Sequence, residues 1–194
     1  MSIAGFRRGS RWTSTLDAEG FFVLYELQHY ETLASNGYLD RLNAPTSWST
    51  RMMPHHLNMI RSQCRIAASF GGGIATSLAT IRVSSESKKE QDLKSALIQL
   101  LTDCASKPGL TGAHLLITDT PRTSGLTTEQ QIRGSDGVAD WIVLISGYEP
   151  AVVADVVSTQ LSATSLRRMG AKENPAWQYR LAFAMTPQDA TATL

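Results

Sequence analysis

The octapeptide QCRIAASF, residues 63–70, has a near copy in QYRLAFAM, residues 178–185. Both begin with Gln, carry Arg at the third position and continue with small and apolar side chains, a composition that suits a strand. Two more pairs of segments recur in the same order, AGF at 4–6 with PGL at 108–110, and FFVLYE at 21–26 with WIVLIS at 141–146. Three collinear matches predict an internal repeat whose halves contribute equivalent strands.

The second half of the chain shows the order of elements in one repeat. We expect strands at 74–83, 113–118, 140–146 and 177–185. A helix is expected between the first two strands, because residues 93, 96, 97, 100, 101 and 104 are apolar at helical spacing. Pro150 opens a second helix and Gly170 closes it. This βαββαβ order is that of a ferredoxin-like unit.

The first half contains only the later elements of such a unit. Strands are expected at 6–14, 21–28 and 59–70, with a broken helical region at 30–58, and the opening strand and helix have no counterpart. We therefore predict an α+β protein made of tandem ferredoxin-like repeats, residues 1–72 and 73–188, followed by a flexible tail at 189–194. The missing elements would leave a sheet edge and an apolar face open to water, which predicts a homo-oligomer.

Bulk composition excludes several classes of protein. The 194 residues are 42% hydrophobic and carry a formal net charge of +1, so the sequence predicts a globular core and no binding of nucleic acid. No apolar run is long enough for a signal peptide or a membrane helix. Cys64 and Cys104 fit reduced thiols, and no residue spacing indicates a metal site. These features predict a cytoplasmic protein without membrane association.

The chain resembles the dimeric α+β barrel superfamily in fused form. The resemblance rests on the two predicted units and on the block IAGFRRGSRW, residues 3–12, which is similar to a Pro-Gly-Phe-type block of EthD-like and antibiotic-biosynthesis-monooxygenase-like proteins. EthD-like proteins often carry a His-rich signature in the first helix, and this chain starts after that point.

The resemblance implies an enzyme of small molecules but leaves the reaction open. The first hypothesis is a cofactor-independent lyase, isomerase or cyclase that acts on a small hydrophobic or aromatic molecule in a catabolic or biosynthetic pathway. The second is a non-catalytic small-molecule-binding or assembly protein. The third is a haem- or oxygen-using enzyme.

Strand parity selects the candidate catalytic residues, because alternate residues face opposite sides of a sheet. We expect the polar face of the repeated strands to line a cavity or to form a solvated edge. One interpretation is a cavity lined by Glu26, Arg65 and Arg180, with Glu26 as general base and Arg65 binding a carboxylate or enolate. The other is that Arg65 pairs with Glu26 and ties two strands together. The recurrence of Arg in both halves favours this structural role.

Five further residues complete the candidate site. His55 is either a surface residue or a general base at the mouth of a cavity. Gln63 lies on the same strand face as Arg65, and is a candidate for substrate binding together with Arg180. The aromatic residues Tyr25, Trp12 and Trp48 either fill the core or stack on a flat substrate. Outside this set, His114 is expected to be a hydrogen-bonded structural residue rather than a haem ligand.

Overall fold

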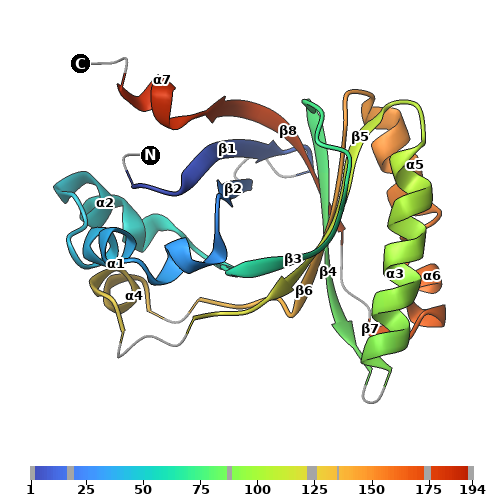
Figure 1. Ribbon diagram of the computed structural model, residues 1–194, viewed down its shortest axis with the longest axis horizontal. Helices are drawn as coiled ribbons and strands as arrows, with labels where there is room; N and C mark the ends of the chain where they lie inside the picture. The colour runs from blue at the N-terminus through green and yellow to red at the C-terminus, as the bar shows by residue number, and fades with distance from the viewer. Residues whose placement is uncertain are drawn as a thin grey trace.

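The structure, a computed structural model, describes residues 3–16, 20–86, 89–121, 126–134, 136–172 and 176–191. These residues form one curled antiparallel sheet with helices grouped at two sides of the molecule (Figure 1). The strands are β1 (Phe6–Ser14), β2 (Phe21–Leu27), β3 (Cys64–Phe70), β4 (Ser77–Ser85), β5 (Leu110–Thr118), β6 (Trp141–Gly147), β7 (Ala171–Lys172) and β8 (Ala176–Met185). The helices are η1 (Tyr30–Ala34), α1 (Asn36–Asn43), α2 (Ser47–Met52), η2 (Met53–His55), α3 (Glu90–Ala105), α4 (Thr128–Arg133), α5 (Pro150–Ser158), α6 (Ala163–Arg168) and α7 (Pro187–Thr191).

The strand order β2-β1-β8-β4-β6-β5-β3 confirms the predicted α+β class. Its central part, β8-β4-β6-β5, is connected through α3 and α5 as a βαββαβ ferredoxin-like unit. The remaining strands extend this unit at both ends, where β1 pairs with β8 and β3 pairs with β5. This arrangement is compatible with two joined repeats, and the boundary at residues 72 and 73 stays a prediction.

One face of the central strands, which we call the outer face, is covered by α3, α5 and α6 (Figure 1). The predicted apolar stripe of α3 is confirmed, because Leu93, Leu97, Leu101 and Cys104 are fully buried. They pack on outward side chains of β4, β5 and β6, among them Ile81, Leu115, Val143 and Ile145. This layer is the main hydrophobic core.

The opposite, concave face, which we call the inner face, holds a second apolar cluster. Trp12, Leu78 and Leu144 are its buried centre, and side chains from β2, β5 and β8 pack around them. Residues from both ends of the sheet thus meet on one inner face. The strands of the first half are tied to the second half by this packing as well as by backbone pairing.

Some predicted boundaries were wrong for identifiable reasons. The helix expected from Pro150 to Gly170 is two helices, α5 and α6, because Ser162 caps a new helix by accepting a hydrogen bond from the backbone of Ser165. The segment between β5 and β6, for which no element was predicted, contains α4, which starts with a capping box in which Thr127 and Gln130 exchange hydrogen bonds. The predicted tail begins inside α7, and residues 192–194 lie outside the described part.

Two long connections gather at the side of the molecule away from α3. One joins β2 to β3 through α1 and α2, and the other joins β5 to β6 through α4 (Figure 1). The backbone N–H of Thr128 donates to the Asn43 side chain at 3.1 Å, and Ile60 pairs with Gly137 in an isolated bridge. We call these packed connections the cap. In the described part of the chain, no helix combines the length and hydropathy needed to cross a bilayer.

Candidate functional site

An ion pair lies on the inner face where β1 and β2 run side by side. Arg8 and Glu26 are cross-strand partners, and they meet through two parallel contacts of 2.7 Å and 3.0 Å between guanidinium nitrogens and carboxylate oxygens. Such a bidentate geometry fixes both side chains. Because both are partly exposed, the pair adds little to stability. The pair is of interest as part of a site because both side chains point to the inner face.

His114 occupies the inner face of β5, where its backbone partner on β3 is Ser69. The Ser69 hydroxyl and Nδ1 of His114 form a hydrogen bond of 2.8 Å. A proton on Nδ1 leaves Nε2 as the basic atom of the ring. A Cβ atom on Gly112 would lie 2.6 Å from Nε2 and 2.9 Å from Oγ of Ser146. Only a glycine at position 112 leaves room for the His114 ring and the Ser146 hydroxyl.

Electrostatics keeps His114 neutral. Burial lowers the pKa of the His114 imidazole below its ordinary value, and the negative charge of Glu26 acts in the opposite direction with a smaller effect. Glu26 on β2 and His114 on β5 thus face the same concave side of the sheet, although their strands are not neighbours. We call Arg8, Glu26, Ser69, Gly112 and His114 the inner-face site. It combines a neutral base and a carboxylate, which can accept a proton, with a fixed cation, which can stabilise negative charge.

The structure does not bring Arg65 or Arg180 to Glu26. Arg65 lies on the other side of its strand, where it binds Asp119 at 2.6 Å and stacks over the ring of Tyr30 at 3.6 Å. Arg180 is exposed on the outer face of β8, directly across from Thr13. The cavity expected between these three residues is therefore absent from the geometry. The polar strand face is the solvated one, and the inner face takes the alternate residues, which include Ile66, Tyr179 and Leu181.

The other sequence candidates are scattered. Tyr25 is exposed on the outer face of β2, Trp48 is exposed on α2, and His55 is exposed at the end of η2. Gln63 donates to the Tyr38 hydroxyl at 3.4 Å within the cap. Of this group only Trp12 lies on the inner face, where it is buried and donates to Ser10 at 2.9 Å.

The residues that sequence reasoning missed are Arg8, Ser69 and Gly112, and His114 was expected to be structural. The predicted hydrogen bond of His114 is present. The alternation of side chains along β2 does indicate the position of Glu26. It puts Glu26 on the same face as Phe22 and Leu24, and this is the inner face. The pairing of β3 with β5, which brings Ser69 to His114, joins two predicted repeats and was not readable from either alone.

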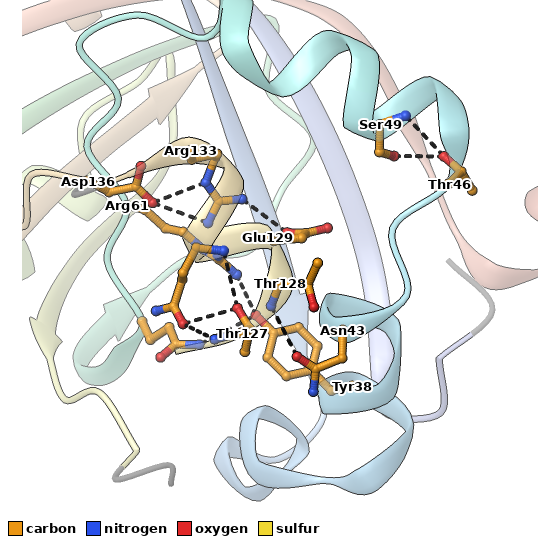
Figure 2. A network of polar contacts seen from close by, with 12 residues as sticks. Tyr38, Asn43, Thr46, Ser49, Arg61, Thr127, Thr128, Glu129, Arg133 and Asp136 are labelled. Atoms are coloured by element: carbon orange, nitrogen blue, oxygen red, sulfur yellow. Dashed lines mark hydrogen bonds and ion pairs between the residues drawn. The ribbon is translucent and has the colours of Figure 1, made fainter. Parts of the chain in front are cut away.

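The cap contains a polar network of a different kind (Figure 2). Arg133 is 8% exposed and lies between Glu129 at 3.0 Å and Asp136 at 3.2 Å. Its Nη2 atom contacts Asp136 as an ion pair but has no hydrogen-bond partner of good geometry among the described residues. A surface pocket of about 480 Å³ lies beside it, lined also by Met53, His56 and Met59. Because the single cation is matched by two carboxylates, this cluster serves to hold α4 in place.

Neither a metal nor a haem fits the side chains of the site. In the ranges that the structure describes, no group of three His, Cys, Asp or Glu residues is arranged to hold a metal ion. Nε2 of His114 lies against Gly112, and the nearby inner face is filled by Trp12, Leu78 and Leu144. A haem macrocycle has no room to reach this nitrogen without displacing that cluster.

Comparison with known proteins places the fold. No family model and no curated protein sequence matches the chain. Among solved structures, an anthrone oxidase-like protein is similar over 96% of this chain and 81% of its own, with a TM-score of 0.64 and 14% identity. A Fusobacterium nucleatum protein assigned as a monooxygenase is similar over 94% of this chain and 79% of its own, with a TM-score of 0.61 and 7% identity.

A haem-degrading enzyme from Listeria monocytogenes is similar over 89% of this chain and 83% of its own, with a TM-score of 0.51 and 8% identity. At such identities the likeness speaks for the fold and not for the reaction. The chain therefore has the curled α+β fold that is also found in monooxygenase-like and haem-degrading proteins.

Proposed function

We propose that the chain is a cofactor-independent enzyme that removes or relocates a proton on a small hydrophobic aromatic molecule. The observation that carries this proposal is the inner-face site, where the imidazole of a neutral His114 packs over Gly112, which has no side chain to displace it, across from the Arg8–Glu26 pair. The kinds of protein that share the fold, which include an anthrone oxidase-like protein, support a small aromatic molecule as the ligand class.

Each residue has a distinct role in this proposal. His114 accepts the proton at Nε2, while Ser69 holds the ring through Nδ1. Arg8 stabilises the enolate or phenolate that forms, because a guanidinium binds an oxyanion through charge-assisted hydrogen bonds. Glu26 orients Arg8 through the two contacts described above. Return of the proton from His114 to another position of the substrate is an isomerisation. In a lyase the enolate would instead expel a leaving group, which takes the bonding electron pair. In a cyclase the enolate carbon would attack a carbonyl carbon of the same molecule, and the proton on His114 would pass to the resulting alkoxide.

The test uses anthrone as the probe, because its methylene hydrogens are acidic and exchange without any oxidant. Under nitrogen in D₂O, we expect the protein to accelerate deuterium uptake at that carbon, as followed by proton NMR. His114→Gln should lower the accelerated rate by about 10²–10⁴-fold, the usual contribution of a general base. Gly112→Ala should have a similar effect, because its Cβ would occupy the space at Nε2.

Arg65→Ala is the matched control, since it removes an Arg from the outer side of β3. We expect it to leave the exchange rate within about twofold. The proposal fails if the wild-type protein does not accelerate exchange, or if His114→Gln and Arg65→Ala lose activity equally while their melting temperatures stay normal.

A binding protein without turnover is the second candidate. The packed inner face favours it, because Trp12, Leu78 and Leu144 are each less than 7% exposed and leave little room for a large substrate. In that case anthrone quenches tryptophan fluorescence but exchanges no faster than in buffer.

The predicted homo-oligomer and cytoplasmic location belong to the same proposal. Val23, Tyr25 and Phe183 are 39%, 59% and 52% exposed on the outer sides of β2 and β8. These apolar side chains would be covered in a homo-oligomer, which sedimentation velocity would detect. The free thiols of Cys64 and Cys104 suit a reducing compartment.

A further inference from the structure

A row of side chains crosses the inner face next to the inner-face site. Ile66, Leu116, Ile142 and Arg82 are consecutive cross-strand partners on β3, β5, β6 and β4. Strands in a sheet are about 4.8 Å apart, so this row is roughly 14 Å wide. The row thus consists of three aliphatic side chains with a guanidinium at one end. We call this row the platform.

The platform is open to solvent. Ile66 is 68% exposed although its side chain faces the inner side of the sheet, and Leu116, Ile142 and Arg82 are only half-buried. The neighbouring row, by contrast, contains the buried Leu144 and Thr80. A ligand can therefore reach the platform without displacing the centre of the inner cluster.

Arg82 is stacked but unpaired. Its guanidinium carbon lies 3.7 Å from the centre of the Trp177 ring, and no carboxylate or hydrogen-bond acceptor contacts it in the part of the chain that the structure describes. The other residue that acts on its charge is Tyr179, which lies on the inner face of β8 opposite Leu78. Stacking on an indole holds the planar fork in one orientation and leaves its N–H groups available. Among the described residues, no anion balances this half-buried cation.

We propose that the platform binds a planar aromatic molecule that carries a carboxylate, with the rings on Ile66, Leu116 and Ile142 and the carboxylate on Arg82. This inference deepens the proposed function, on which it rests for the link to His114. On the inner side of β5, His114 is next to Leu116, so Arg82 and His114 are two inter-strand spacings and one inner row apart. That corresponds to roughly 12 Å between their backbones. A molecule of two or three fused rings spans this distance and carries its acid group at one end and its reactive position at the other.

The test measures binding without turnover. The probes are 2-naphthoate and its uncharged methyl ester, and the readout is quenching of tryptophan fluorescence, to which Trp177 contributes directly. For the wild-type protein we expect the acid to bind about tenfold or more tightly than the ester, as expected for charge-assisted hydrogen bonds to a guanidinium. Arg82→Gln should remove this preference and leave ester binding nearly unchanged.

Two further variants test whether binding depends on the planar geometry of the Arg82 guanidinium or only on its charge, and whether the effect is specific to this arginine. Arg82→Lys keeps the charge but loses the planar fork, so it should retain only part of the preference. Arg180→Gln removes an exposed arginine from the outer face of β8 and should change nothing. Each variant is first checked for a wild-type melting temperature, and Arg82→Lys carries the test if Arg82→Gln does not fold.

The outcomes are separable from those of the exchange experiment. Preferential binding of naphthoate that depends on Arg82 supports the platform even if anthrone exchange is never accelerated. Equal binding of acid and ester, no binding of either, or a preference that survives in Arg82→Gln overturns it, whatever the exchange experiment shows.

Discussion

The first and second halves of the sheet have the same backbone features but different surroundings. Gly5 and Gly109, which precede β1 and β5, both have positive φ angles, +89° and +97°. The carbonyl of each accepts a backbone hydrogen bond from just after the next strand, from Gln28 at 2.7 Å and from Tyr148 at 3.1 Å. Both hairpins therefore begin with the same left-handed glycine and close in the same way.

Bulges recur at equivalent positions too. Arg7 on β1 and Thr111 on β5 are extra residues without a cross-strand partner, and they are 104 residues apart, as are the two glycines. Ala67 on β3 and Ala182 on β8 are also unpaired, at the 115-residue offset that aligns the two quoted octapeptides. Bulges are costly, local and specific features of a strand. Their recurrence supports the prediction of an internal repeat.

What differs is the cover on the outer face. Leu115 on β5 is fully buried under α3, whereas Arg11, its equivalent on β1, is exposed and stacks on Phe21. The same position in a hairpin can thus hold an apolar or a charged residue. It is apolar where a helix covers the outer face and charged where none does. At these positions the two hairpins share backbone features, whereas their side chains differ with the surroundings.

The inner face breaks the symmetry more sharply. Arg8 corresponds to Gly112, and Glu26 corresponds to Ser146, so an ion pair in one half is replaced in the other by two small residues against which the His114 ring packs. The inner-face site lies where these unequal halves face each other. A small molecule could meet charge on one side and the imidazole of His114 on the other.

The largest expected effect tests the unequal cover. Leu115→Ala should lower the free energy of unfolding by about 2–5 kcal/mol, because it leaves a cavity under α3. Arg11→Ala, at the equivalent exposed position, should cost less than about 1 kcal/mol. Urea unfolding followed by circular dichroism measures both. Equal costs would mean that β1 is covered in solution, for example by a second copy of the chain.

A smaller effect tests the shared backbone. Gly5→Ala and Gly109→Ala should each destabilise by about 1–3 kcal/mol, because both glycines have positive φ. The new Cβ atoms would also lie 2.4 Å from Thr32 and 2.9 Å from Val152. Gly37→Ala is the control, since no atom lies within 4 Å of its Cβ position and it is helical. We expect that variant to be neutral or slightly stabilised. A tolerated Gly109→Ala would contradict the equivalence of the two hairpins.

Sequence reasoning reached the fold because the evidence for it is local. Strand composition, the helical stripe of Leu93, Leu97 and Leu101, and the repeated octapeptides each depend on residues close together in the chain. The site depends on distant pairings instead. Polarity predicts that the Arg65 side of β3 either lines a cavity or forms a solvated edge, and the pairing of β3 with β5 puts Arg65 on the outer side, on Asp119. Polarity indicates contact with water, and in this sheet the outer side of β3 is the side in contact with water.

The smallest predicted effect is a loss of folding stability at acidic pH, and it is caused by the protonation of His114. Burial lowers the pKa of His114 in the folded protein, whereas in the unfolded chain the imidazole titrates near its ordinary value of about 6.5. Below that pH the unfolded state binds a proton more readily than the folded state, so the free energy of unfolding must fall as the pH drops from about 6.5 through the folded pKa. Urea midpoints at pH 7.5 and 5.5 measure this loss.

His114→Gln should remove most of the loss between these two pH values, because the group that gains a proton on unfolding is gone. His55→Gln, which changes an exposed histidine outside the sheet, should retain it. Ser10, the residue equivalent to His114 in the first half, does not titrate, so the acid sensitivity belongs to one half of an otherwise repeated frame. If His114→Gln keeps the full loss, the histidine is more solvated than its packing beside Ser69 and Gly112 indicates, and its role as the neutral base of the inner-face site would have to be abandoned.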